Sequence, residues 1–264
     1  DDLIPVSSKP LTSFAEFAHS LADSGIPCVW VTSRNRHQLD ASLRKLGHSE
    51  PFIAEGGSCV YTSEDYFHLK PAHTVRLGRF IGIPVAEPQP AAADALDRLS
   101  EQTNVTVVPL RSLSPRELMQ NTGLPRAEAD LIRQRDFDEL FFFAGASDED
   151  IQRFRQQAAQ LKLAVRPNNS LWSLAVKASL PTCVRELRKL YDRAFHKAAF
   201  SVAVATAPDG VELFSACDRA ILFSDRAYPG DTDKPKSGPA PKALPLFGQH
   251  SWEEAIESIR TRHF

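Results

Sequence analysis

The sequence predicts an α/β protein, in which a core with a parallel sheet and crossover helices is interrupted by a smaller α+β insert. Two observations support this prediction. Helix and strand patterns alternate early in the chain, where a helical apolar pattern at 11–25 ends at Gly25 and a buried strand is expected at 26–33. From about residue 74 the sequence turns to prolines, hairpin patterns and short helices, and the first texture resumes with a helix at 180–194.

The remaining elements follow from the same patterns. Before the insert, a helix is expected at 36–47, and a strand, a Gly-Gly turn and a second strand at 51–63. Within the insert, the patterns predict helices at 91–103 and 148–163, a helix start at 114–117, a strand at 139–146 and a hairpin at 163–178. After it, they predict a strand and turn at 200–210, a short helix at 211–218, a strand at 219–223, a loop at 228–245 and a final helix from 251.

The composition is that of a soluble globular protein. Hydrophobic residues make up 42% of the chain and charged residues 24%, and the net charge of −2 argues against binding to nucleic acid or to a membrane surface. No apolar run reaches the length of about 18 residues that a membrane span needs, and no signal peptide is visible. The four cysteines are scattered without a C-x-x-C pair, so a cytoplasmic location is expected.

Four stretches occur in an order that is typical of one family. Thr32-Ser33-Arg34 ends a predicted buried strand, and Ala54-Glu55-Gly56-Gly57 forms the turn of the next strand pair. The insert contains "NTGLPRAEADLIRQRDFDELFFF", and "VELFSACDRAILF" follows in the last part of the chain. Together these stretches resemble the haloacid-dehalogenase (HAD) superfamily, in particular the mannosyl-3-phosphoglycerate phosphatases of its Cof-like branch, over nearly the whole chain.

The resemblance implies a Rossmann-like core of residues 1–76 and 179–264 and a cap domain of residues 77–178. It also implies hydrolysis of a phosphate monoester with Mg²⁺, in which one Asp attacks phosphorus and a second Asp, two residues later, acts as acid and base. A Ser/Thr and a Lys would hold the phosphate, because a dianionic phosphate and a carboxylate nucleophile repel each other. Mg²⁺ takes oxygen ligands in strict octahedral geometry, so its carboxylates are not easily replaced.

The family's catalytic positions are only partly present in this sequence. Thr32 matches the phosphate-binding hydroxyl, with a Thr that caps the following loop as the alternative. Asp1 matches the acid/base Asp or its neighbour, which would place the nucleophile before residue 1; an ordinary polar terminus is the simpler interpretation. The family's Lys falls on Leu180 or Pro181, so Lys177 is the candidate substitute, with a solvated surface lysine as the alternative.

The metal-binding loop is changed at two positions. Thr206 stands where the family has its first metal carboxylate, and Gly210 stands at the last. Asp209 is the one remaining candidate ligand, and its alternative is an ordinary Pro-Asp-Gly turn. A Mg²⁺ site with a single carboxylate is expected to be weak.

Substrate contacts are expected from the loops beside these positions. An Arg fork binds carboxylate or phosphate in a bidentate way, and glycine lets a ligand approach the backbone closely. The alternative for the cap arginine is a charge cluster exposed to water at a helix end. The candidate substrate-binding residues are Ser33, Arg34, Glu55, Gly56, Gly57 and Arg135.

Three hypotheses for the function follow from the residues and the resemblance. The first is a phosphatase-like protein whose hydrolysis is impaired or lost and which binds a phosphorylated sugar or glycerate, or a protein partner. The second is an active Mg²⁺-dependent sugar phosphatase, with its Asp nucleophile before residue 1 and with Asp209 and Lys177 as displaced substitutes. The third is a structural subunit with a closed cleft.

Overall fold

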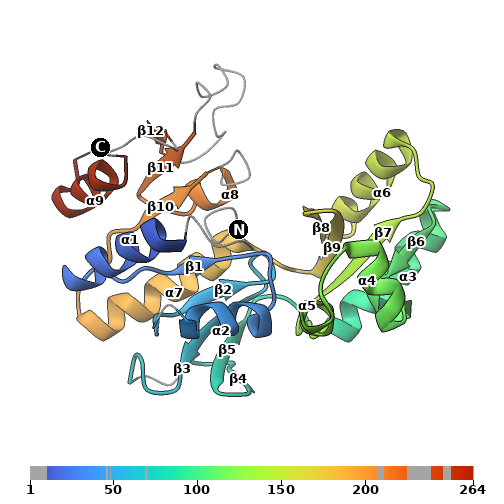
Figure 1. Cartoon of the computed structure of the whole chain (residues 1–264), viewed down its shortest axis with the longest axis horizontal. Helices are drawn as coiled ribbons and strands as arrows, with labels where there is room; N and C mark the ends of the chain where they lie inside the picture. Colours follow the sequence, from blue (N-terminus) through green and yellow to red (C-terminus); the bar gives the residue numbers. More distant parts are fainter. Residues whose placement is uncertain are drawn as a thin grey trace. The chain divides into compact units, whose positions relative to one another are not determined.

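The computed structural model describes residues 11–45, 47, 49–68, 71–206, 211–224, 239–245 and 251–263 (Figure 1). The chain divides into two compact units: Asp1–Trp30, Phe67–Leu69 and Leu180–Phe264 form the first, and Val31–Tyr66 with Lys70–Ser179 form the second. The second unit therefore groups residues 31–66 with the predicted cap. The division into a core of 1–76 and 179–264 and a cap of 77–178 stays a prediction.

The first unit is built around a three-stranded parallel sheet in the order β10-β11-β12. Its elements are α1 (Leu11–Asp23), α7 (Leu180–Phe195), β10 (Val202–Ala205), α8 (Val211–Phe214), β11 (Arg219–Phe223), β12 (Lys242–Leu244) and α9 (Ser251–Thr261). Buried Ala203, Phe214, Ala220 and Leu222 form a core cluster. The prediction of a loop over 228–245 was wrong for Lys242–Leu244, since a three-residue strand beside prolines has too little periodicity to be recognised.

The second unit contains a five-stranded sheet in the order β1-β2-β3-β5-β4. Its strands are β1 (Trp30–Val31, of which Trp30 is counted with the first unit), β2 (Phe52–Ala54), β3 (Cys59–Ser63), β4 (Val75–Leu77) and β5 (Phe80–Pro84), and α2 (Arg36–Lys45) follows β1. The pairs β2–β3, β3–β5 and β4–β5 are antiparallel, whereas the strand–helix alternation predicted a parallel sheet in this part of the chain. The Gly-Gly turn between β2 and β3 is a tight connection, and a connection of that length can only join antiparallel strands.

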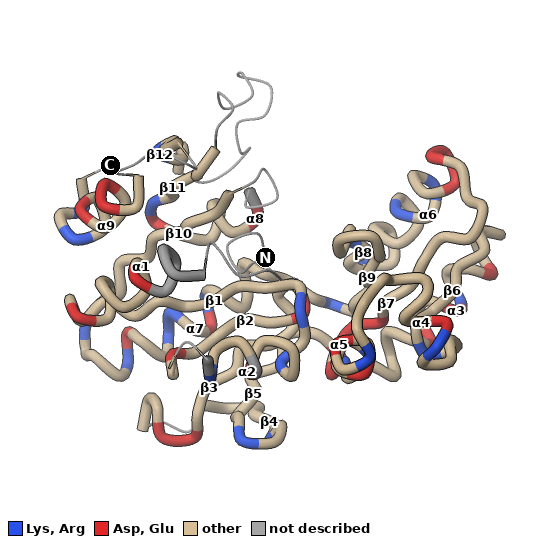
Figure 2. Tube along the Cα trace, in the orientation of Figure 1, with Lys and Arg blue, Asp and Glu red and all other residues tan. Residues whose placement is uncertain are grey.

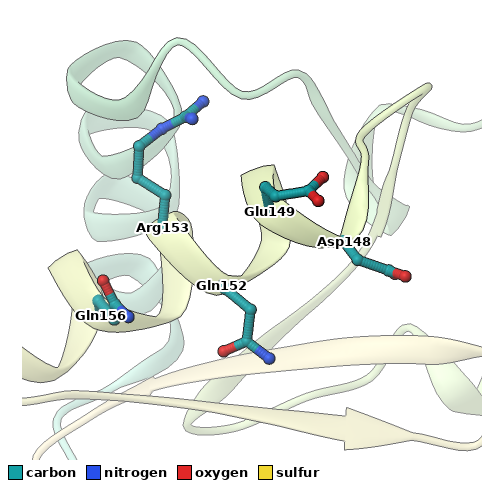
Figure 3. Close-up of a pocket in the computed structure, with 5 residues that line it drawn as sticks. All are labelled: Asp148, Glu149, Gln152, Arg153 and Gln156. Carbon is teal, nitrogen blue, oxygen red and sulfur yellow. The ribbon is translucent and has the colours of Figure 1, made fainter.

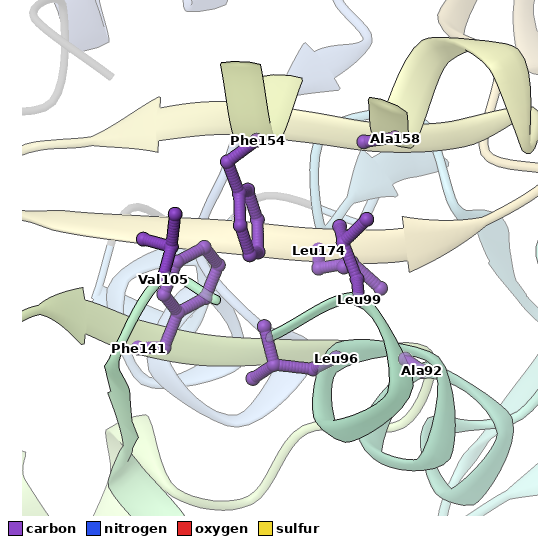
Figure 4. Close-up of a cluster of buried hydrophobic side chains, with 8 residues drawn as sticks. All are labelled: Ala92, Leu96, Leu99, Val105, Phe141, Phe154, Ala158 and Leu174. Carbon is purple, nitrogen blue, oxygen red and sulfur yellow. The ribbon is translucent and has the colours of Figure 1, made fainter. Parts of the chain in front are cut away.

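The second unit also contains a four-stranded antiparallel sheet in the order β6-β7-β9-β8. Its strands are β6 (Val107–Pro109), β7 (Asp138–Phe143), β8 (Leu163–Asn168) and β9 (Leu171–Val176). One face packs on α3 (Gln89–Thr103) and α6 (Asp148–Gln160) through the buried cluster in Figure 4, which includes Leu96, Phe141 and Phe154. The predicted hairpin at 163–178 is confirmed as β8 and β9.

The opposite face of this sheet packs on a 3₁₀ turn at Leu110–Ser112 and on α4 (Pro115–Thr122) and α5 (Arg126–Ile132). Leu140 lies in the cluster on this side, and its neighbour Phe141 lies in the cluster on the other, as alternation along a strand requires. The sheet is thus covered on both faces. Residue 138 shares the face of Leu140, toward α4 and α5.

Capping residues fix the starts of two helices in the insert. Ser114 and Glu117 form a capping box at α4, and Ser147 and Asp150 form another at α6. Acidic residues gather at the first turn of α6, where the helix dipole favours them, and they appear red in Figure 2. Among the helices that the structure describes, none combines the length and the apolar content needed to cross a bilayer.

Candidate functional site

The loop of residues 32–34 lies between β1 and α2 and is closely hydrogen-bonded. Thr32 is 3% exposed, and its Oγ1 accepts a hydrogen bond from the N–H of Arg34 at 3.0 Å. Asn35 caps α2, since its Oδ1 accepts a hydrogen bond from the N–H of Gln38 at 2.9 Å. The hydroxyl of Thr32 therefore stabilises the backbone of the loop, and the N-cap residue of α2 is the buried Asn35.

The turn of residues 55–58 connects β2 to β3 in an unusual backbone conformation. Glu55, Gly56 and Gly57 have φ values of 51°, 62° and 94°, which place three successive residues in the left-handed region. The N–H of Glu55 donates to the carbonyl of Arg34, and the N–H of Gly56 donates to that of Thr32, both at 3.0 Å. The turn is thus bonded directly to the 32–34 loop.

The carboxylate of Glu55 is buried, with the residue 2% exposed. Its oxygens accept hydrogen bonds from the backbone N–H groups of Asp136 at 3.0 Å, Phe137 at 2.8 Å and Asp138 at 3.0 Å. Burial and the charge of Asp138 raise the pKa of Glu55 to about 8, against the lowering effects of Arg135 and of these N–H donors. Glu55 therefore joins the turn to the residues that lead into β7.

Arg135 is also buried and paired inside the unit. Its side chain is 5% exposed, and its guanidinium donates to both carboxylate oxygens of Asp138 at 2.5 and 2.6 Å and to the carbonyl of Ser33 at 2.9 Å. Burial alone would lower the pKa of Arg135, but the Asp138 and Glu55 carboxylates raise it above its usual value. The alternative of a charge cluster exposed to water was wrong for Arg135. A contact between Arg135 and substrate stays a prediction.

Two polar residues of β8, which sequence reasoning missed, reach the same loops. Nη1 of Arg166 donates to the carbonyl of Gly56 at 2.6 Å, and Nδ2 of Asn168 donates to that of Ser33 at 3.4 Å. The hydroxyl of Ser33 in turn donates to Oδ1 of Asn168 at 3.5 Å. Since these contacts join residues more than 100 positions apart, no local sequence pattern signals them.

A second group of side chains links the start of α2 to the segment at 136–138. Arg36 pairs with Asp136 at 2.6 Å, and the side chains are 16% and 14% exposed. The hydroxyl of Tyr61 donates to Asp136 at 3.1 Å. Burial raises the pKa of Tyr61, so this hydroxyl stays protonated and acts as a donor. The predicted residues Thr32, Ser33, Arg34, Glu55, Gly56, Gly57 and Arg135 thus lie together within one unit.

Of the other predicted positions, the structure describes Lys177 and Leu180. The ammonium group of Lys177 pairs with Glu87 at 2.5 Å, and its side chain is 67% exposed. Leu180, 8% exposed, begins α7, which makes it a packing residue. Asp1 and Asp209 lie outside the described residues, as does Gly210.

No preformed metal site is found in the part of the chain that the structure describes. There, no group of three or more His, Cys, Asp or Glu side chains is arranged to hold an ion. Thr206 follows directly after β10, so a neutral hydroxyl occupies the strand end where the resemblance expects a carboxylate. The donors at this position do not fit the oxygen-rich, anionic shell that Mg²⁺ prefers.

A hollow of about 500 Å³ lies along α6, away from the predicted site residues. Figure 3 shows the residues that line it, which are Asp148, Glu149, Gln152, Arg153 and Gln156. All five belong to one helix, and each has a long or charged side chain. The hollow therefore adds nothing to the site formed by the 32–34 loop and the 55–58 turn.

Curated proteins from two organisms match the chain in sequence. The "Glucosyl-3-phosphoglycerate/mannosyl-3-phosphoglycerate phosphatase" of Persephonella marina is 21% identical over 202 residues, which are 75% of this chain and 72% of that protein. The protein of the same name from Methanococcoides burtonii is 24% identical over 121 residues, or 46% of this chain and 44% of that protein. No family model matches the chain.

Solved structures show the same fold across nearly the whole chain. A haloacid dehalogenase-like hydrolase from B. subtilis has a TM-score of 0.62 at 12% identity and covers 99% of this chain and 96% of its own. A HAD subclass IIB sugar phosphatase has a TM-score of 0.54 at 11% identity and covers 96% and 91%. The predicted resemblance is confirmed: the chain has the α/β fold of the HAD-like hydrolases, with a Rossmann-like core, and is similar in sequence to the mannosyl-3-phosphoglycerate phosphatases.

Proposed function

We propose that this protein recognises a phosphorylated sugar–glycerate, the class of compound in the names of its curated relatives, and that its phosphate-ester hydrolysis is impaired. One observation carries the proposal. The loop that resembles the family's phosphate-binding loop is retained at Thr32-Ser33-Arg34, whereas the positions of two metal carboxylates are Thr206 and Gly210. The proposal therefore separates binding, which needs the first loop, from turnover, which needs the metal.

Charge is the reason for this separation. Hydrolysis through an Asp nucleophile brings a carboxylate against a phosphate dianion, and a divalent cation offsets their repulsion. A hydroxyl at Thr206 and a bare backbone at Gly210 bring no negative charge, so Asp209 alone would have to hold the ion. Binding of a phosphate needs only donors, and we assign this role to the side chains of Ser33 and Arg34, because the N–H groups of Thr32 and Arg34 already donate to Ile53 and to the Thr32 hydroxyl.

The buried residues limit which groups would contact the ligand. The carboxylate of Glu55 already accepts hydrogen bonds from the N–H groups of 136–138, and the guanidinium of Arg135 already donates to the carbonyl of Ser33. The proposed ligand contacts are therefore the side chains of Ser33 and Arg34. Gly56 and Gly57 would contribute only a close approach of the ligand to the backbone, because their N–H groups already donate to the carbonyls of Thr32 and Ala54. Arg34 is half-buried, and burial lowers its pKa, with Glu128 acting in the opposite direction, so an anionic ligand would offset the cost of its desolvation.

Hydrolysis and binding should be measured on the same full chain. We expect calorimetry to detect binding of mannosyl-3-phosphoglycerate or glucosyl-3-phosphoglycerate without metal, and phosphate release with Mg²⁺ to stay near background. The variant Thr206→Asp/Gly210→Asp restores the two carboxylates and should raise release by at least about 100-fold, the scale of one well-placed electrostatic group. Absence of binding would contradict the recognition half of the proposal.

The second candidate is an active Mg²⁺-dependent sugar phosphatase, favoured by the retained Thr32-Ser33-Arg34 loop. In this case an Asp nucleophile would precede residue 1, with Asp1 as acid/base, and Asp209 and Lys177 would serve as displaced substitutes. Turnover that requires Mg²⁺ in the unmodified chain, and that falls in Asp209→Asn, would establish this candidate over the first.

A further inference from the structure

The 55–58 turn collects hydrogen bonds from three separate segments of the second unit. The carboxylate of Glu55 accepts from the N–H groups of residues 136–138 at 2.8–3.0 Å. The carbonyl of Ser58 accepts from the N–H groups of Val85 and Ala86, both at 2.9 Å. The carbonyl of Gly57 accepts from the N–H of Ser179 at 3.0 Å. Six backbone N–H donors therefore converge on one four-residue turn.

One of these segments leads from the five-stranded sheet toward the four-stranded sheet, and the other two border strands of the four-stranded sheet. Residues 85–86 follow β5 and lead toward α3, residues 136–138 lead into β7, and Ser179 follows β9. The residues that lead from β5 toward α3 thus donate hydrogen bonds to the turn, and so do the residues that lead into β7 and the residue that follows β9. In these contacts the acceptor on Glu55 is a side-chain carboxylate, whereas the acceptors on Gly57 and Ser58 are backbone carbonyls.

The other side of the turn holds the 32–34 loop. The N–H groups of Glu55 and Gly56 donate to the carbonyls of Arg34 and Thr32 at 3.0 Å, which fixes the backbone of the loop. Glu55 has a φ of 51°, a conformation that costs a side-chain-bearing residue free energy and that persists only when its surroundings enforce it. The three bonds of its carboxylate are the surroundings that enforce it.

We propose that Glu55 is a positioning residue: its carboxylate holds residues 136–138 on the turn and thereby sets the backbone of the 32–34 loop. Glu55 makes no contact with ligand in this role, since it is 2% exposed and its two oxygens already accept three hydrogen bonds. The inference rests on the proposed function only in one respect, that the 32–34 loop is where phosphate binds.

The charges around Glu55 allow a mild substitution to test this. The carboxylates of Glu55, Asp136 and Asp138 lie with the guanidinium groups of Arg36 and Arg135, and the neutral Tyr61 hydroxyl completes the cluster. Three acids against two bases leave one excess negative charge when all are ionised. The substitution Glu55→Gln removes that excess and keeps one acceptor oxygen, so the variant is expected to fold.

Hydrogen exchange resolved by mass spectrometry tests the inference directly. In Glu55→Ala we expect the amides of 136–138 to exchange at least about tenfold faster, because three hydrogen bonds to a buried carboxyl group are lost. We expect the amides of Glu55 and Gly56, which hold the 32–34 loop, to exchange faster too, with a smaller increase in Glu55→Gln. The matched control is Glu139→Gln, another buried Glu, whose carboxylate bonds to the side chains of Gln89 and Arg111. Since the N–H of Gln89 donates to the carbonyl of Asp136, we expect this control to change exchange at 136–138 far less than the Glu55 variants do and to leave Glu55 and Gly56 unchanged.

Each outcome decides a different part of the inference. Unchanged exchange at 136–138 in a folded Glu55 variant overturns it, and faster exchange at 136–138 alone overturns the link to the 32–34 loop. If Glu55→Ala does not fold, the comparison of Glu55→Gln with Glu139→Gln decides the same two questions. Calorimetry with inorganic phosphate is a separate measurement, in which we expect weaker binding by the Glu55 variants than by Glu139→Gln. If the unmodified chain does not bind phosphate, the proposed function is refuted, and the exchange data still decide the role of Glu55.

Discussion

The ion pair between Arg135 and Asp138 allows a quantitative prediction. Both side chains are almost fully buried, at 5% and 2% exposure, and the guanidinium makes a bidentate contact with the carboxylate. The substitution Arg135→Met keeps much of the side-chain volume but leaves Asp138 without its cation and next to Glu55. Removal of one partner from a buried pair costs about 3–5 kcal/mol, so we expect a loss of stability of that size.

The double variant Arg135→Met/Asp138→Leu leaves no uncompensated charge at this pair. We therefore expect it to be more stable than Arg135→Met alone, although the third bond, to the carbonyl of Ser33, stays lost. Because the chain forms two compact units, a denaturant titration should be followed by amide exchange in β7, which reports on the second unit alone.

An exposed pair on α6 supplies the control. Arg153 and Asp150 lie 2.6 Å apart with side chains 54% and 34% exposed, so Arg153→Met should cost below about 1 kcal/mol. If Arg135→Met costs no more than this control, the Arg135–Asp138 pair does not stabilise the unit and our description of the site is wrong.

Three further predictions follow from other features. Gly56→Ala should destabilise the second unit by about 1–2 kcal/mol in the same titration. The φ of 62° disfavours a side chain, and the new Cβ would lie 3.3 Å from Nη1 of Arg166. Unchanged stability would contradict this account of the turn. Burial raises the pKa of Glu55 from 4.5 to about 8 in the folded state, so the folded state keeps a proton that the unfolded state loses. The free energy of unfolding should therefore fall as the pH rises from about 5 to 8. Glu55→Gln should flatten this pH dependence, and equal slopes in the two proteins would refute the assignment. Phe154→Ala removes a fully buried ring and should cost about 3–5 kcal/mol, whereas Leu161→Ala, at 47% exposure, should cost under about 1 kcal/mol; similar costs for the two would contradict the packing in Figure 4.

Local sequence patterns predicted most of the elements in the insert. Early acidic residues in the stretches that begin at 114 and 148 predicted α4 and α6, because such signals lie within a few residues of the helix start. The direction of strand pairing was harder to predict. A parallel sheet was expected for the core, yet β2–β3–β5–β4 is antiparallel, since a short turn and not a crossover helix joins β2 to β3.

The candidate site was predictable only where a family pattern lies within one stretch of sequence. The positions of Thr32–Arg34, Glu55–Gly57 and Arg135 came from such patterns, and the structure brings them together. Arg166 and Asn168 were missed because their partners lie more than 100 positions away and become neighbours only after folding. Burial was equally out of reach: nothing in the sequence indicates that Glu55 and Arg135 point inward.

The hydrogen bonds across the 55–58 turn determine where the boundaries of an expressed fragment should lie. A recombinant fragment limited to residues 77–178 would lack Glu55, Ser33 and Gly56, so the amides of 136–138 and the guanidinium groups of Arg135 and Arg166 would lose the acceptors they have in the intact chain. A fragment that starts at residue 31 and ends at residue 179 keeps all of these partners, and is the better choice for crystallising this half of the molecule by itself.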